Sequence, residues 1–165
     1  MKTLLKQYFG FDEFRPLQAE IIDNVMAGKD SFVLMSTGGG KSLCYQLPAL
    51  KFPGLTIVIS PLIALMKDQV DALKACGAKA EFINSSLTAE QINQVCERAK
   101  NGEVKILYLA PERLALESFK DFLKTLSVSL IAIDEAHLPQ LRPAQKNIAR
   151  RTDYRPNRDC HRQGA

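Results

Sequence analysis

Short apolar runs rich in β-branched residues alternate with segments of helical spacing along most of this 165-residue chain. The runs are roughly five to seven residues long and lack the polar alternation of half-exposed strands, which is typical of strands buried on both faces. Five such strands are predicted, over residues 31–35, 55–60, 80–84, 104–110 and 128–134. Strands that alternate with helices favour an α/β fold, a parallel sheet with flanking helices.

Apolar residues spaced three or four positions apart predict helices between these strands. The helical segments lie within residues 17–25, 62–73, 92–96 and 114–123. Gly28, Gly77 and Gly102 stand just beyond helix ends, and residues 86–90 offer N-cap side chains. These local signals support the same alternating architecture as the strand pattern.

The basic charge of the chain is concentrated at its C-terminal end. The net charge is +4, but residues 142–165 carry seven Lys or Arg and two Asp, which leaves residues 1–141 with fifteen basic and sixteen acidic side chains. Bulk charge therefore provides no evidence that residues 1–141 bind nucleic acid. Residues 142–165 also lack helical and strand periods, so we expect a partial domain over residues 1–141 followed by a basic tail.

No segment has the length of a membrane helix or the pattern of a disulfide-rich secreted domain. The apolar runs fall far short of about 20 residues, and charged side chains interrupt the start of the chain. The four cysteines stand far apart without a C-x-x-C pair, which argues against a disulfide framework and against a zinc site. We expect a cytoplasmic protein with no membrane partner.

A glycine-rich segment that ends in lysine and serine joins the first predicted strand to a helix. It reads Ser36-Thr37-Gly38-Gly39-Gly40-Lys41-Ser42. Its backbone N–H groups can surround a phosphate, Lys41 can reach the β- and γ-phosphates, and the Ser42 hydroxyl can bind Mg²⁺. Met35 occupies the place of the usual first glycine, and a plain glycine turn is the alternative, but such a turn has no need of Lys-Ser. The segment predicts a nucleotide-binding P-loop.

Two carboxylates, Asp134 and Glu135, follow the last predicted strand. Open α/β sheets bind ligands at the carboxyl ends of their strands, where the P-loop also lies. Asp134 suits the Mg²⁺ shell opposite Ser42, and Glu135 suits a role in orienting or deprotonating the water that attacks the γ-phosphate. By itself an acidic pair is more often a helix cap or a solvated turn. Its place about 90 residues after a P-loop favours the Walker B interpretation.

These two motifs and the sequence between them resemble the RecQ family of superfamily 2 DNA helicases. Gly-Gly-Gly-Lys-Ser and Asp-Glu-Ala-His are similar to helicase motifs I and II. Further likeness, in the family's order, lies in residues 9–11, 14–18, 35–49, 60–70 and 109–114. The resemblance implies an ATP-dependent 3′ to 5′ DNA helicase of recombination and repair, whose RecA-like domain has the P-loop NTPase fold and binds ATP and Mg²⁺. That domain is truncated here.

The resemblance assigns roles to residues that show none by themselves. Arg15 and Gln18 are similar to an adenine-recognition motif in which the Gln18 amide binds the base edge; without the family they are a solvated helix start. The implied nucleotide-binding set is Arg15, Gln18, Thr37, Gly38, Gly39, Gly40, Lys41 and Ser42. His137, which alone is more readily structural, matches a histidine that couples the nucleotide site to DNA. The implied catalytic set is Lys41, Asp134, Glu135 and His137.

Two further segments match family regions that contact single-stranded or partly duplex DNA. They are residues 60–69 and 111–113. The Ser60 hydroxyl and the N-terminus of the helix that follows it are suitable partners for backbone phosphates, so the resemblance implies DNA binding that is independent of base sequence. Without the family, the segments are an exposed helix face and a helix start with proline at its first position. The implied DNA-binding residues are Ser60, Pro61, Leu62, Lys67, Gln69, Pro111, Glu112 and Arg113.

The resemblance ends after His137. The family continues with a tryptophan-containing aromatic loop and a threonine-bearing motif III, whereas this chain continues with Leu138-Pro139-Gln140-Leu141 and contains no Trp. A one-base shift in permitted codons for residues 156–163 restores an apolar strand and a motif III-like Ala-Thr-Ala. We therefore expect residues 142–165 to be disordered or frameshifted, with a divergent natural tail as the alternative.

Unwinding in this family needs a second RecA-like domain, which supplies an arginine to the transition state. This chain offers no such domain, so we expect a fragment that binds ATP and Mg²⁺, contacts DNA and does not unwind it. The parent protein would lie with the nucleoid in a bacterium and contact other repair proteins. A superfamily 2 RNA helicase fragment and a non-catalytic remnant are the two alternatives.

Overall fold

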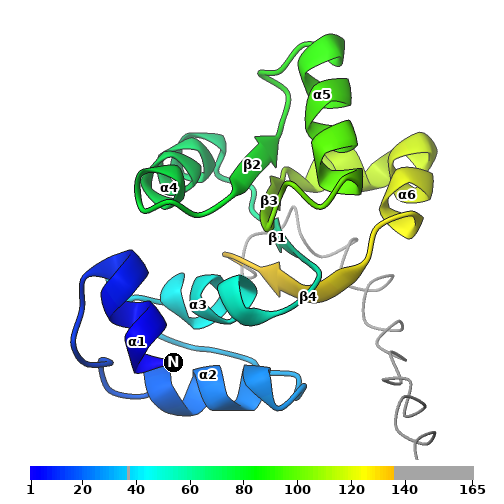
Figure 1. Ribbon diagram of the computed structural model, residues 1–165. Coiled ribbons are helices and arrows are strands. Elements are labelled where there is room, and N and C mark those ends of the chain that lie inside the picture. Colours follow the sequence, from blue (N-terminus) through cyan, green and yellow to red (C-terminus); the bar gives the residue numbers. More distant parts are fainter. Residues whose placement is uncertain (37, 136–165) are drawn as a thin grey trace, which may run out of the picture.

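The computed structural model describes residues 1–36 and 38–135, which contain a four-stranded parallel sheet (Figure 1). The strands, in the spatial order β2, β3, β1, β4, are β1 (Leu55–Ile59), β2 (Ala80–Ile83), β3 (Ile106–Leu109) and β4 (Val128–Ile133). Ile57 of β1 pairs with Leu107 on one side and with Ile131 on the other. The predicted α/β class is confirmed, because parallel neighbours need long crossover connections and helices supply them here.

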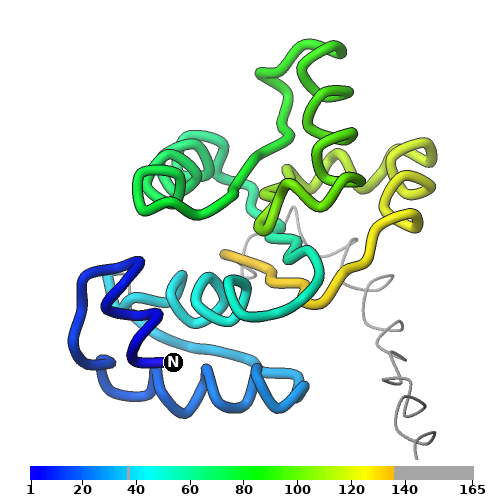
Figure 2. Tube along the Cα trace, in the orientation of Figure 1, coloured from blue at the N-terminus to red at the C-terminus, as the bar shows by residue number. Residues whose placement is uncertain are grey.

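Helices flank the sheet, and a helical N-terminal segment packs beside α3 (Figure 2). The helical elements are α1 (Lys2–Leu4), the π-helical turn η1 (Leu5–Phe9), α2 (Gln18–Met26), α3 (Leu43–Lys51), α4 (Ile63–Ala75), α5 (Ala89–Lys100), the 3-10 turn η2 (Pro111–Ala115) and α6 (Glu117–Lys124). The predicted cap before Gln91 is present: the Thr88 hydroxyl accepts the Gln91 N–H at 3.2 Å, and the Gln91 side chain accepts the Thr88 N–H at 2.9 Å. This reciprocal capping box explains why α5 begins where it does.

The two faces of the sheet carry separate apolar cores. Alternate side chains of β1, Ile57 and Ile59 among them, pack with α5 and α6. Val58 and Tyr108 face the other side, where α3 and α4 cover them. Strand side chains alternate between faces, so strands covered on both sides are largely apolar, as the pattern predicted for β1 and β3, although Thr56 of β1 is a buried polar residue.

The predicted strand at residues 31–35 is wrong. This segment has no regular secondary structure and joins none of the four strands. Phe32 and Leu34 are 82% and 81% exposed. An apolar run shows that a segment suits a strand, but a strand forms only where a neighbour pairs with its backbone groups.

β4 is also less buried than predicted. None of its residues is fully buried, and Ile131 is 39% exposed. In the described part of the chain β4 pairs with β1 alone, so its outer edge and part of its surface lack cover. An edge position in the sheet therefore explains the difference from β1.

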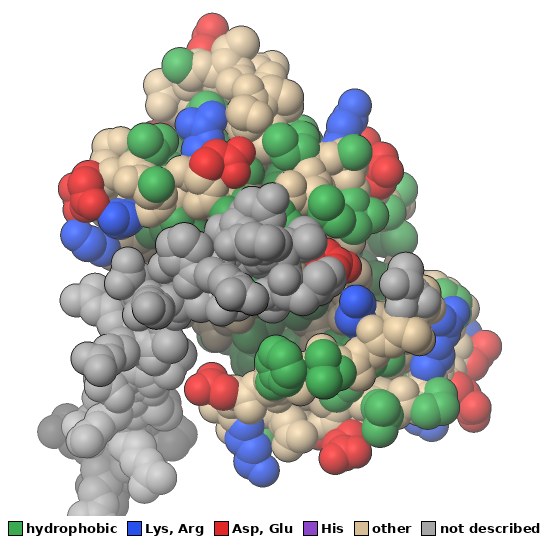
Figure 3. Space-filling model, turned by 180° about the vertical axis from the view of Figure 1, so that it is seen from behind, with side chains coloured by type: hydrophobic (Ala, Val, Ile, Leu, Met, Phe, Trp, Pro, Cys, Tyr) green, Lys and Arg blue, Asp and Glu red, His purple; other side chains and the backbone are tan. Residues whose placement is uncertain are grey.

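Charged side chains are mixed over the surface. Figure 3 shows basic, acidic and hydrophobic side chains interspersed on the face that it presents, without a continuous basic patch among the described residues. This agrees with the balanced charge predicted for residues 1–141. None of the described helices is long and apolar enough to span a membrane. The predicted boundary at residue 141 and the tail 142–165 lie outside the described residues.

Candidate functional site

The glycine-rich loop predicted to bind phosphate precedes α3 and depends on glycine geometry. Gly38 and Gly40 have φ angles of +80° and +82°, in the left-handed region that side chains rarely adopt. A Cβ atom at Gly40 would also lie 2.4 Å from the side-chain nitrogen of Gln18. The backbone angle therefore favours glycine at position 40, and a larger residue there would also have to displace the end of the Gln18 side chain.

Arg15 and Gln18, predicted near the base of a nucleotide, contact this loop. The Gln18 amide donates to the Gly40 carbonyl at 3.0 Å, and the Arg15 guanidinium donates to the Gly38 carbonyl. The Gln18 side chain also accepts the Arg15 backbone N–H at 2.8 Å. Leu17, between them, has a φ of +71°, an unusual angle for a residue with a side chain. The start of α2 and the glycine loop therefore form one hydrogen-bonded unit.

A cavity of about 420 Å³ brings the predicted nucleotide residues together. This volume lies within the range of about 300–1,000 Å³ that is usual for ligand pockets. Phe11, Glu13, Leu43 and Leu65, which were not among the predicted site residues, also line it. The predicted residues in its lining are Arg15, Gln18, Gly38, Gly40, Lys41, Ser42, Gln69, Asp134 and Glu135.

The acidic pair enters the cavity from the end of β4. Asp134 is 7% exposed, and Glu135 has a φ of +55°. Lys41 Nζ lies 3.7 Å from Glu135 Oε1, so the loop lysine and the second carboxylate form an ion pair. The two predicted motifs, separated in sequence, thus meet in one site, with opposite charges facing each other.

Burial and the neighbouring negative charge of Glu135 raise the pKa of the Asp134 carboxyl above its ordinary value. Hydrogen bonds from Tyr45, from the Glu135 backbone and from Gln69 oppose this rise. Burial also raises the pKa of the Tyr45 hydroxyl, which keeps its proton. The Tyr45 hydroxyl lies 3.3 Å from Asp134 Oδ2, so it is a donor to the carboxylate.

The donor set fits a magnesium-bound polyphosphate. Mg²⁺ prefers oxygen ligands and is usually held by one or two carboxylates together with phosphate oxygens and water. Ser42 and Asp134 provide a hydroxyl and a carboxylate on the wall of the same cavity, and Lys41 provides a cation for phosphate. No group of three or more His, Cys, Asp or Glu suited to a metal occurs in residues 1–36 and 38–135, so a site built wholly from protein ligands is not seen there.

A hydrogen-bonded group behind the cavity was missed by the sequence reasoning. The Tyr108 hydroxyl donates to Gln69 Oε1 at 2.7 Å and accepts from the Gln46 amide at 2.8 Å. Tyr45 and Gln46 follow Ser42 by three and four positions, which places them on its face of α3. That spacing could have identified Tyr45 and Gln46 from the sequence. Tyr108 lies inside an apolar strand, where no sequence pattern indicates a role at the site.

The residues predicted to contact DNA begin at the carboxyl ends of β1 and β3, which are neighbours in the sheet. Leu62, Lys67 and Glu112 are exposed, whereas Ser60 and Pro111 are buried and Pro61 is half-buried. The half-buried Arg113 donates to the Asn84 carbonyl at 2.9 Å. Gln69 lines the nucleotide cavity instead of facing outward with Lys67.

Two predicted site residues, Thr37 and His137, lie outside the described residues. Gly39 lies in the loop, and a Cβ atom there would be 3.0 Å from the Ser36 carbonyl oxygen. The remaining nucleotide-site residues of the prediction lie on the wall of the cavity.

Comparison with known sequences identifies the family of this chain. Residues 15–161 match the family model of the DEAD/DEAH box helicases. Proteins named ATP-dependent DNA helicase RecQ are 53% identical over 135 residues in Haemophilus influenzae and 47% identical over 153 residues in Bacillus subtilis. These alignments cover 82% and 89% of this chain but 22% and 26% of the relatives. The chain therefore spans about a quarter of the length of these two relatives.

Comparison with solved structures supports the fold. A protein described as a hypothetical ATP-dependent RNA helicase from Sulfolobus tokodaii superimposes with a TM-score of 0.65. The match covers 88% of this chain and 44% of that one, at 22% sequence identity. At this identity the likeness establishes a shared fold and says nothing about the nucleic acid bound.

Proposed function

Because this chain belongs to the DEAD/DEAH box helicase family, we propose that it forms the nucleotide-binding part of a RecQ-type ATP-dependent 3′ to 5′ DNA helicase. The observation that carries the proposal is the single cavity in which the glycine loop, Lys41, Ser42 and the Asp134–Glu135 pair meet. Its relatives of similar sequence are named as DNA helicases. The proposed unit is a partial RecA-like domain over residues 1–141, with residues 142–165 as a separate tail.

Each residue of the cavity has a proposed part in binding or hydrolysis. Lys41 exchanges its ion pair with Glu135 for the β- and γ-phosphates of ATP, because these phosphates carry more negative charge than one carboxylate. Ser42 and Asp134 hold Mg²⁺, which neutralises phosphate charge when bound. Glu135, freed from Lys41, orients the attacking water and accepts its proton.

The base of the nucleotide is proposed to bind the Gln18 side chain in place of the Gly40 carbonyl, with which this side chain joins α2 to the loop. Gln18 now donates to the Gly40 carbonyl, and an amide can turn its donor and acceptor to the edge of adenine. Arg15 lines the same cavity. We expect these two residues to discriminate ATP from nucleotides with other bases.

DNA is proposed to lie across the carboxyl ends of β1 and β3, next to the cavity. Lys67 and the start of α4 suit phosphates, while Arg113 holds the neighbouring loop through the Asn84 carbonyl. Such contacts do not depend on base sequence. A DNA substrate would place the parent protein at the nucleoid of a bacterium, among other repair proteins.

The 165 residues by themselves are proposed to bind ATP without unwinding DNA. An arginine supplied by another domain commonly contributes about 10³–10⁵ in the rate of phosphoryl transfer. The RecQ relatives are about four times longer than the matched region, and a partner domain would come from that additional length. An RNA helicase fragment remains testable by comparing RNA and DNA as competitors for binding.

Binding of a fluorescent ATP analogue in the presence of Mg²⁺ tests the proposal. Lys41→Ala should weaken binding by about tenfold to a hundredfold, because a charge-assisted hydrogen bond contributes roughly 1.5–3 kcal/mol. Lys51→Ala is the matched control, since Lys51 is an exposed lysine at the end of the same helix. Equal affinity of the Lys41 variant and the wild type would refute the P-loop assignment, and absence of binding in the wild type would favour a non-catalytic remnant.

A further inference from the structure

Gln69 on α4 reaches into the group of polar side chains behind the nucleotide cavity. Its Oε1 atom lies 2.7 Å from the Tyr108 hydroxyl, 3.1 Å from the Tyr45 hydroxyl and 3.4 Å from the Gln46 amide nitrogen. Its Nε2 atom lies 3.5 Å from Ser42 Oγ, the longest of these contacts. One side chain of α4 therefore contacts two residues of α3, the Ser42 N-cap of that helix and one residue of β3.

The hydrogen atoms available determine how these contacts are shared. Gln46 donates to the Tyr108 hydroxyl at 2.8 Å, so the Tyr108 proton is directed to Gln69 Oε1. An amide oxygen has two lone pairs, and the two hydroxyls nearest to Gln69 Oε1, those of Tyr108 and Tyr45, can fill them, because the Gln46 amide nitrogen lies farther away at 3.4 Å. The single Tyr45 proton also lies near Asp134 Oδ2, at 3.3 Å, so it is shared between Gln69 and the carboxylate in a three-centre bond.

The position of Gln69 on its helix distinguishes it from its neighbours. Lys67, two residues earlier, is exposed, and side chains two positions apart on a helix do not face each other. Gln69 is half-buried and points inward, to the residues that flank Ser42 and Asp134. Groups that hold a metal ligand in place commonly change metal affinity by about 10–100-fold when they are removed.

We propose that Gln69 is a positioning residue for the metal-dependent part of nucleotide binding. It holds the Tyr45 ring beside Asp134 and the Ser42 hydroxyl toward the cavity, without touching the nucleotide or the metal. This inference rests on the proposed function, since it concerns the same cavity. It differs from the DNA contact predicted for Gln69 from sequence, because the side chain acts on the opposite face of α4.

Titration of Mg²⁺ at a fixed concentration of a fluorescent ATP analogue tests the proposal on the full 165-residue chain. Gln69→Met preserves the size of the side chain and removes its hydrogen bonds. We expect the Mg²⁺ concentration for half-maximal binding to rise about fivefold, while binding in EDTA stays at the wild-type level. Asp71→Asn, an exposed change on α4, should leave both values unchanged.

Each other result decides against the proposal. An unchanged Mg²⁺ midpoint in Gln69→Met overturns it. An equal loss of nucleotide affinity with and without Mg²⁺ also overturns it, because Gln69 would then line the cavity without acting on the metal site. Absence of nucleotide binding in the wild type defeats the proposed function and this inference together, whereas binding by the wild type with an unchanged Mg²⁺ midpoint in the variant defeats this inference alone. If Gln69→Met does not fold, as judged by circular dichroism, Tyr45→Phe takes its place, and a wild-type Mg²⁺ midpoint in that variant overturns the proposal.

Discussion

The two edge strands of the sheet, β2 and β4, differ in how their outer sides are covered. β2 has three buried residues among its four, and the helices α4 and α5 enclose it. β4 has six residues, none fully buried, and Ile131 is 39% exposed. Both strands were predicted from similar apolar runs. The difference in burial therefore shows that the helices packed around a strand matter as much as its own sequence.

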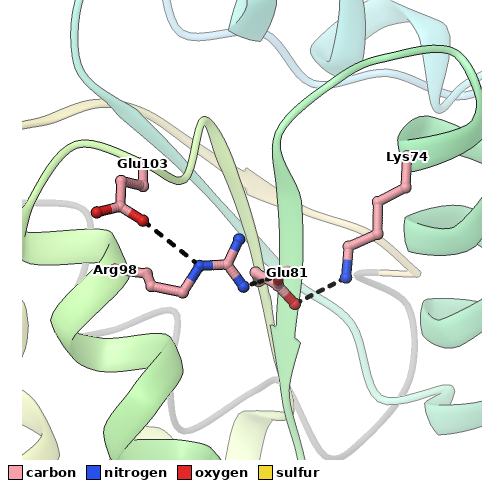
Figure 4. Close-up of polar contacts among 4 residues, drawn as sticks. All are labelled: Lys74, Glu81, Arg98 and Glu103. Carbon is pink, nitrogen blue, oxygen red and sulfur yellow. Dashed lines mark hydrogen bonds and ion pairs between the residues drawn. The ribbon is translucent and has the colours of Figure 1, made fainter.

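Charge adds to the protection of the β2 edge. Figure 4 shows Glu81 of β2 between Arg98 of α5 and Lys74 of α4, at 2.6 Å and 3.0 Å. The Glu81 residue is 8% exposed, so its carboxylate is held among these cations close to the core. A charged residue on an edge strand opposes pairing with another chain. In the described part of β4 the side chains are uncharged, so that edge lacks this protection.

The largest expected effect on the free energy of unfolding comes from truncating one isoleucine in each edge strand. Ile83 of β2 is fully buried, so Ile83→Ala should reduce the free energy of unfolding by about 3 kcal/mol through lost burial and a cavity. Ile131→Ala on β4 should cost about 1 kcal/mol or less, because that side chain is already partly in water. Urea unfolding followed by circular dichroism measures both. Equal losses would mean that the β4 face is covered in solution.

A smaller effect is expected from the Glu81 cluster. Glu81→Gln should reduce the free energy of unfolding by about 1–2 kcal/mol, because it removes a mostly buried negative charge from between two cations, and these cations can return to water. The matched control is Glu103→Gln, whose side chain is 54% exposed and lies 3.7 Å from Arg98; its cost should stay below about 0.5 kcal/mol. Denaturation at low and high salt compares the two, and similar costs for both would remove the special role of Glu81.

Adding a charge to one edge strand and removing the charge from the other should change the self-association of the protein. Ile131→Lys places a charge on the open β4 strand and should lower light scattering at high protein concentration. Glu81→Gln removes the charge from β2 and should raise scattering. If neither variant changes scattering, unprotected edges do not control association of this protein.

The smallest expected effect concerns the segment at residues 31–35. Phe32→Ser and Leu34→Ser should each change the free energy of unfolding by less than about 0.5 kcal/mol, because both side chains are more than four-fifths exposed. Urea unfolding provides the measurement, with Ile22→Ser, a change at a buried site, as the destabilising reference. A loss near 2 kcal/mol at Phe32 or Leu34 would show that the segment packs against the protein in solution.

Local patterns were sufficient for much of the fold. Four predicted strands agree with β1 to β4 within about two residues at each end, because apolar runs bounded by turns identify strands directly. Thr88 and Gln91 form the expected cap, since capping depends on residues three positions apart. The glycine loop was recognisable from its residue types at short range, whereas the acidic pair was interpreted from its position about 90 residues after that loop; the roles of both stay predictions.

Long-range contacts account for the rest. Within residues 1–36 and 38–135, the segment 31–35 has the composition of a strand but no paired neighbour, and β4 has the composition of a buried strand but no cover on its outer side. Gln69 lies next to residues of an exposed helix face, yet it turns inward to Tyr45, Tyr108 and Ser42. Sequence spacing describes one element at a time, whereas burial, strand pairing and shared protons arise only when separate elements meet.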